Sequence, residues 1–280
     1  RPKFHWYKPQ IAILSGIAWD HINVFPTYEN YVNQFRIFKN DVEDVLFYCD
    51  DDKVLSDLCQ EDSTCRLEAY SVPNHYVEGG ITYLIDGEDK HRLEIFGEHN
   101  LQNLNAALLV CIELGIQKSD FYKAISMFKG ASKRLELVKR GESSVVYKDF
   151  AHSPSKLKAT SSAMKKQYTH RVLVACMELH TFSSLNKGFL KEYMGTMDTP
   201  DTAVVYFSKE AIAHKKLEDI SVEQVHKAFG RQDLKIFTDS TDLQQFLKSL
   251  EWKNRNLLMM SSGNFDGIDF KRLAEDLLGS

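Results

Sequence analysis

The stretch Ile11-Ala-Ile-Leu-Ser-Gly-Ile-Ala-Trp-Asp-His-Ile-Asn-Val-Phe25 is an apolar run that ends abruptly in the polar pair Asp20-His21. This pattern is typical of a buried strand that carries two polar groups to the edge of a sheet, where open α/β folds bind their ligands. A carboxylate beside an imidazole can hold Mg²⁺, shuttle a proton or simply make a hydrogen bond. The polar residues at the other strand ends are needed to choose among these roles.

The composition indicates an ordinary soluble protein that is long enough for two domains. The chain has 280 residues, of which 43% are hydrophobic and 26% charged. Its net charge is −4 and it has no basic block, so nucleic acids and membrane surfaces are not expected partners. No apolar run approaches the roughly 20 residues of a membrane span, so membrane insertion is not expected.

The cysteines and the start of the chain bear on compartment and completeness. Five scattered cysteines without a CxxC motif predict reduced thiols in a cytoplasmic protein. The sequence begins Arg1-Pro2-Lys3-Phe4, without Met and without a recognisable signal peptide. We therefore expect a fragment of a longer protein.

In the first part of the chain, the apolar patterns predict six strands and four helices. We expect strands at residues 10–15, 45–48, 66–72, 75–77, 81–85 and 91–95, and helices at 27–39, 53–60, 100–113 and 119–128. Asp86-Gly87 predicts a hairpin turn, and Ser119 is a candidate N-cap.

The second part alternates more regularly between strands and helices. We expect strands at residues 144–147, 171–175, 202–207, 234–237 and 256–260, and helices at 155–166, 186–197, 222–228, 241–250 and 269–278. Such alternation predicts a mostly parallel, Rossmann-like sheet covered by helices. The chain lacks GxGxxG, so the usual dinucleotide-binding motif is not supported. We place the domain boundary near residues 129–135.

Polar clusters follow three of the predicted strands of the second part. They lie at residues 149–154, 178–184 and 261–267, and they are rich in Ser, Thr, His and Gly. In a parallel sheet these ends share one edge, so the clusters converge. Hydroxyls, imidazoles and exposed backbone amides suit a ligand that bears phosphate or carboxylate. One such cluster alone is typical of caps and turns, but three together favour a ligand site.

Two further polar segments allow both a structural and a functional interpretation. Residues 97–107 open a predicted helix, in which Asn100 is either the N-cap or, with Asn103, an amide that faces a base edge. Residues 128–136 lie at the predicted boundary and contain Arg134. This arginine is either a solvated hinge charge or a clamp on a phosphate between the domains.

Four of these segments resemble, in order, motifs of the Mur ligases, which join amino acids or peptides to UDP-N-acetylmuramate precursors of peptidoglycan. Trp19-Asp20-His21 resembles the family's xDH segment, and residues 97–107 resemble GxHNxxNxxAA. Residues 128–136 resemble FxGxxxRxE, and residues 149–154 resemble D-Y-[AG]-H-x-P. The similarity runs over nearly the whole chain.

The resemblance implies an α/β fold in two parts. Residues 1–131 would be the C-terminal part of a P-loop-type Mur central ATPase domain. Residues 132–280 would be the Rossmann-like Mur ligase C-terminal domain, with a mostly parallel sheet. Family members carry a GxxGKT[ST] loop before this region, and the present chain has no such loop. We therefore expect little or no ligase activity from this chain alone.

The amine that is added is less clearly indicated by the sequence. Residues 260–268 resemble the MSNGxFxGI segment of murein-tripeptide ligases, which attach L-alanyl-γ-D-glutamyl-meso-diaminopimelate to UDP-N-acetylmuramate. His180-Thr181 is closer to the L-alanine-adding branch. A folylpolyglutamate or cyanophycin synthetase relative and a non-catalytic nucleotide- or peptide-binding module are further alternatives. A metallohydrolase lacks the HxH or HExxH spacing that it would need.

The resemblance also implies a reaction, cofactors and residue roles. The reaction would be ATP-dependent amide formation through an acyl phosphate, with ATP and Mg²⁺ as cofactors. The partners would be UDP-N-acetylmuramate and an amino acid or murein peptide, bound by a monomer or weak dimer. The roles carried over are Mg²⁺ ligation by His21 with Asp20 behind it, ATP binding by Asn100, Asn103 and Arg134, catalysis by Asp149 and His152, and binding of the incoming peptide by His180, Thr181, Ser183 and Asn264.

Overall fold

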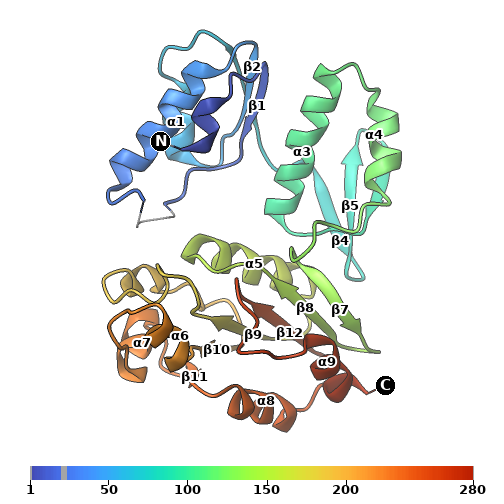
Figure 1. Cartoon of the computed structure of the whole chain (residues 1–280). Coiled ribbons are helices and arrows are strands. Elements are labelled where there is room, and N and C mark those ends of the chain that lie inside the picture. The colour runs from blue at the N-terminus through green and yellow to red at the C-terminus, as the bar shows by residue number, and fades with distance from the viewer. Residues whose placement is uncertain (1, 20–23, 280) are drawn as a thin grey trace. The chain divides into compact units, whose positions relative to one another are not determined.

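A computed structural model describes residues 2–19 and 24–279 and divides the chain into two compact units, Arg1–Lys129 and Gly130–Ser280 (Figure 1). Each unit has its own hydrophobic core, and each is described separately below.

The first unit contains a parallel sheet in the order β1-β2-β3. Its strands are β1 (Ile11–Leu14), β2 (Val45–Cys49) and β3 (Arg66–Tyr70), preceded by the 3₁₀ turn η1 (Lys3–Trp6). The connecting helices are α1 (Tyr28–Asp41) and α2 (Lys53–Cys59). Both begin as the sequence predicts, because the side chains of Thr27 and Asp52 accept hydrogen bonds from backbone N–H groups of the first turn.

A second, antiparallel sheet follows in the first unit. It consists of β4 (His75–Glu78), β5 (Ile81–Asp86) and β6 (Asp89–Leu93), and its β5–β6 hairpin confirms the predicted turn. Helices α3 (Glu98–Glu113) and α4 (Lys118–Ile125) come next. The N-cap of α4 is Gln117, so the predicted cap at Ser119 is wrong. Helix α3 begins after Gly97, which places Asn100 in its first turn and not at the cap.

The second unit is built on one sheet with the strand order β11-β10-β9-β12-β8-β7. The bounds of these strands are β7 (Glu136–Arg140), β8 (Val145–Asp149), β9 (Val172–Glu178), β10 (Thr202–Tyr206), β11 (Lys235–Phe237) and β12 (Arg255–Met260). Strands β8 to β12 run parallel, which confirms the mostly parallel sheet. The edge strand β7 is antiparallel and was not predicted from the sequence.

In the described part of the second unit, five helices accompany this sheet. They are α5 (Pro154–Gln167), α6 (Lys209–His214), α7 (Val222–Phe229), α8 (Ser240–Ser249) and α9 (Phe270–Leu278). The helix predicted at residues 186–197 is wrong, because this segment contains only the 3₁₀ turn η2 (Leu190–Tyr193). The side-chain oxygen of Asn186 accepts hydrogen bonds from the N–H groups of Gly188 and Phe189, and such local bonds compete with a helix.

The core of the second unit fixes the central strands of its sheet. Leu257 of β12 and Val174 of β9 are fully buried and pack with Leu243 of α8 and Leu273 of α9. Figure 1 shows α5 on the opposite face of this sheet. Helices thus cover both faces of the sheet, as is usual for parallel strands. Strands β8, β12 and β9 are parallel neighbours, so their carboxyl ends lie side by side and the loops that follow them share one edge.

Candidate functional site

The three polar clusters of the second unit meet at the carboxyl edge of its sheet, as the sequence predicts. They follow β8, β12 and β9, which are neighbours in the sheet. The backbone N–H of Ser261 donates a 3.0 Å hydrogen bond to the carbonyl of Asp149, so the first and third clusters are directly joined. This edge is the place where open parallel sheets bind ligands.

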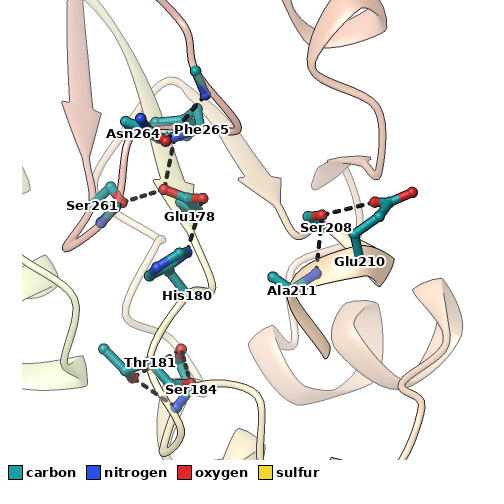
Figure 2. Close-up of polar contacts among 12 residues, drawn as sticks. Glu178, His180, Thr181, Ser184, Ser208, Glu210, Ala211, Ser261, Asn264 and Phe265 are labelled. Atoms are coloured by element: carbon teal, nitrogen blue, oxygen red, sulfur yellow. Dashed lines mark hydrogen bonds and ion pairs between the residues drawn. The ribbon is translucent and has the colours of Figure 1, made fainter. Parts of the chain in front are cut away.

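A buried carboxylate, Glu178, lies at the centre of the edge (Figure 2). Its side chain is 3% exposed. Its Oε2 atom accepts a 2.9 Å hydrogen bond from the N–H of Phe265 and a second one from the hydroxyl of Ser261. Its Oε1 atom lies 3.3 Å from Nδ1 of His180, whose side chain is 37% exposed. Glu178 thus joins the loop after β12 to the loop after β9.

The loop after β12 has a constrained backbone. Phe265 and Asp266 adopt left-handed φ angles of 52° and 60°, which non-glycine residues adopt only when the surroundings enforce them. Phe265 is fully buried and serves as the anchor. The Ser261 hydroxyl accepts a 2.6 Å hydrogen bond from Gly263 N–H while it donates to Glu178. The loop is therefore held in one conformation around the carboxylate.

Gly263 is required by this close approach. A Cβ atom at this position would lie 2.8 Å from Oε2 of Glu178 and 2.9 Å from Nδ1 of His180. Both distances are shorter than real carbon contacts, so any larger side chain must push the carboxylate and the imidazole away. The site is shaped for glycine at this point.

The other residues predicted to bind the incoming peptide lie on the loops that follow β9 and β12. Thr181 belongs to the turn after β9, where its hydroxyl donates to Ser184 Oγ at 3.0 Å and accepts from Ser184 N–H at 3.1 Å. Ser183 is half-buried, and Asn264 is exposed, with its Oδ1 accepting from Gly267 N–H at 3.1 Å. Figure 2 shows Asn264 and His180 on different sides of Glu178.

Arg134, Asp149 and His152 occupy a second corner of this unit. Asp149 is 5% exposed, and its two oxygens accept from the N–H groups of Leu135 and Ala151 at 2.7 and 2.6 Å. His152 Nδ1 lies 2.7 Å from the carbonyl oxygen of Phe150. The Arg134 guanidinium lies over the Phe150 ring at 5.5 Å. The His152 ring lies 5.1 Å from the same Phe150 ring. The structure therefore brings Arg134 and His152 to one aromatic ring, and Asp149 fixes the backbone beside Arg134.

The predicted residues of the first unit are only partly described. Asp20 and His21 lie outside the described residues. The loop that precedes them is tied to the N-cap of α2, because Asp52 Oδ2 accepts a 2.6 Å hydrogen bond from Ile17 N–H. On α3, Asn100 is half-buried and donates to the carbonyl of Phe96 at 2.9 Å, whereas Asn103 is exposed.

Residues 2–19 and 24–279 contain no group of three or more His, Cys, Asp or Glu side chains that could hold a metal ion. In the same residues, no helix has the length and apolar character needed to cross a membrane.

Sequence reasoning missed the role of Glu178. The available signal is its position: it is the one charged residue of β9, and it ends a strand that is otherwise apolar. Tyr206, its neighbour in register on β10, was also missed. Burial raises the pKa of the Tyr206 phenol, so this hydroxyl stays protonated beside the carboxylate.

Comparison with known proteins shows what this chain is similar to. Residues 3–111 match the model of the Mur ligase middle domain. The UDP-N-acetylmuramate–L-alanine ligase of Paenarthrobacter aurescens is 31% identical over 71% of this chain and 46% of its own length. That of Lactobacillus johnsonii is 26% identical over 94% of this chain and 61% of its own length. The chain thus spans less than two thirds of either relative.

A solved structure shares the fold of this chain. The crystal structure of a murein peptide ligase from Psychrobacter arcticus matches all of this chain and 60% of its own, with a TM-score of 0.62 and 19% identity. The two units therefore have the fold of Mur ligases, residues 3–111 match the Mur ligase middle domain, and the chain is a homologue of UDP-N-acetylmuramate–L-alanine ligases.

Proposed function

We propose that this chain is part of an ATP-dependent ligase that joins an amino acid or a peptide to UDP-N-acetylmuramate through an acyl phosphate. The observation that carries the proposal is the meeting of three polar loops at one sheet edge, in a chain whose residues 3–111 match the Mur ligase middle domain. Charged and hydroxyl side chains at such an edge suit a substrate that bears carboxylate and phosphate groups.

The two parts of the chain would have different tasks. We assign residues 1–131 to the C-terminal portion of the central ATPase domain and residues 132–280 to the Mur ligase C-terminal domain. In the first part, Asn100 and Asn103 would face the adenine of ATP. His21 would hold Mg²⁺ and Asp20 would orient it; the ion, when bound, neutralises charge on the phosphoryl group that is transferred.

In the second part, Asp149 would act on the nucleotide through Arg134. The carboxylate of Asp149 fixes the backbone at Leu135, one residue from Arg134. A guanidinium held in this way can pair with phosphate oxygens. His152 lies in the same corner, on the segment that follows β8. Arg134 would neutralise charge on the reacting phosphate, and Asp149 and His152 would orient the groups around it, which is how phosphoryl-transfer sites act.

The incoming amine would bind at the other corner, near Glu178. His180, Thr181, Ser183 and Asn264 would hold it. Two amines are candidates. L-Alanine is favoured by the similarity to UDP-N-acetylmuramate–L-alanine ligases, and the murein tripeptide by the resemblance of residues 260–268 to the MSNGxFxGI segment.

A coupled assay tests the proposal. The 280-residue chain and the longest form that its gene encodes are each incubated with ATP, Mg²⁺, UDP-N-acetylmuramate and either L-alanine or the tripeptide. We expect phosphate release and an amide product from a form that contains a P-loop, with one amine strongly preferred, and little turnover from the chain alone. Nucleotide binding without product from any form would instead support a non-catalytic binding module.

A further inference from the structure

The two oxygens of Glu178 have different partners, and this difference decides which ring nitrogen of His180 carries a proton. Oε2 accepts from the N–H of Phe265 and from the hydroxyl of Ser261. Oε1 faces Nδ1 of His180 at 3.3 Å (Figure 2). An ionised carboxylate can only accept, so the ring nitrogen that faces it is the one that carries a proton.

We propose that Glu178 is a positioning residue, which holds His180 with its proton on Nδ1 and leaves Nε2 as an acceptor for an N–H of the incoming amine. In a neutral imidazole one nitrogen donates and the other accepts, so a proton fixed on Nδ1 makes Nε2 the acceptor. The His180 side chain is 37% exposed, whereas Glu178 is 3% exposed. This inference rests on the proposed function, because it names the group that His180 would bind.

A purely structural role for Glu178 is the competing explanation, and one substitution separates the two. The Phe265 N–H can only donate, so in Glu178→Gln the amide oxygen must take the place of Oε2. The amide NH₂ group then faces Nδ1 of His180 and donates to it. The loop tie is kept, since the amide oxygen still accepts from the Phe265 N–H and the Ser261 hydroxyl, but the ring must move its proton to Nε2.

The state of the ring is measured by ¹⁵N NMR on the 280-residue chain with labelled histidine, and His180→Gln assigns the signal. We expect a protonated Nδ1 in the unmodified chain and a protonated Nε2 in Glu178→Gln. The matched control is Glu210→Gln, since Glu210 accepts from the Ser208 hydroxyl at 2.9 Å near the end of the neighbouring strand β10 (Figure 2). This control should leave the His180 signal unchanged.

Two results of this measurement would overturn the proposal. One is a proton on Nε2 in the unmodified neutral ring, which needs no variant to observe. The other is an unchanged tautomer in a folded Glu178→Gln chain. If Glu178→Gln does not fold, Ser261→Ala replaces it: it removes one donor to Oε2 but leaves Oε1 facing the ring, so a proton that leaves Nδ1 in this variant would contradict the proposal.

The second arm measures kinetics in the longest form that the gene encodes. Glu178→Gln should raise KM for the amine about tenfold, the loss of one hydrogen bond to substrate, and leave KM for ATP unchanged. A tautomer that moves without any change in the amine KM would refute the positioning role. Absence of turnover with every amine would refute the proposed function, while the NMR result still decides what Glu178 does to His180.

Discussion

Asp149 accepts a 2.7 Å hydrogen bond from the backbone N–H of Leu135, and so holds the segment that carries Arg134 against the end of β8. The backbone of this segment is unusual, because Lys133 and Leu135 have left-handed φ angles of 58° and 41°. Left-handed residues other than glycine persist only where other contacts enforce them. The Asp149 carboxylate supplies such a contact.

We therefore predict that Asp149→Ala lowers the free energy of unfolding by about 3 kcal/mol, because two buried N–H groups lose a charged acceptor. Asp149→Asn should cost less, since its amide oxygen can still accept one of the two bonds. The midpoint of urea unfolding measures both changes. Equal stability of Asp149→Ala and the unmodified chain would show that the carboxylate does not hold this segment.

A second prediction concerns Lys39, a buried cation on α1. Its Nζ donates to the carbonyls of Leu58, Glu61 and Asp62 at 3.0, 3.0 and 3.1 Å, and the residue is 1% exposed. Lys39→Met keeps the volume of the side chain but leaves these carbonyls without their donor. We expect a loss of about 3 kcal/mol in unfolding free energy.

The matched control for Lys39 is Lys53→Met, on the neighbouring helix α2. The Lys53 side chain is 85% exposed and pairs with Asp57 at 3.1 Å. Exposed ion pairs contribute little to stability, so this variant should unfold like the unmodified chain. If both variants unfolded at the same urea concentration, the three carbonyl bonds of Lys39 would have no net stabilising effect.

Gly263→Ala should damage the second unit locally. The new methyl group would lie 2.8 Å from Glu178 Oε2, so the loop after β12 must move. We expect a loss of about 2 kcal/mol, as is usual for overpacking in a well-packed region. Gly141→Ala is the control, because its new atom would meet Leu278 at an ordinary 3.5 Å. Thermal unfolding of the two variants should differ, and identical curves would contradict this account.

The sequence predicted every described strand of the two units except β7, and the meeting of strand ends in the second unit, because both follow from local patterns. Apolar runs such as Leu173–Ala175 mark buried strands, and parallel strands must end at one edge. It did not predict that Glu178 accepts from Phe265, since the two residues are 87 positions apart and their contact depends on the strand order β9-β12. The failed helix at residues 186–197 has a different cause: the side chain of Asn186 competes for the backbone.

The thiols give a last prediction that depends on pH. Cys49, Cys59, Cys65 and Cys176 are buried, and Cys111 is half-buried. Burial raises the pKa of Cys59 to about 11, so the folded chain keeps this thiol protonated at pH values where the unfolded chain ionises it. Stability should therefore fall as the pH rises from the ordinary thiol pKa toward 11, where the folded form begins to ionise as well.

At pH 8 a thiolate-specific disulfide reagent should modify Cys111 quickly and the four buried cysteines slowly, because only the accessible thiolate reacts. Cys111→Ala should remove the fast phase, and urea should make the remaining thiols reactive. Raising the pH should accelerate the slow phase as the folded state loses stability. Fast reaction of all thiols in the folded chain at pH 8 would mean that the cores around β2, α2 and β9 open readily, contrary to the burial of Cys49, Cys59 and Cys176.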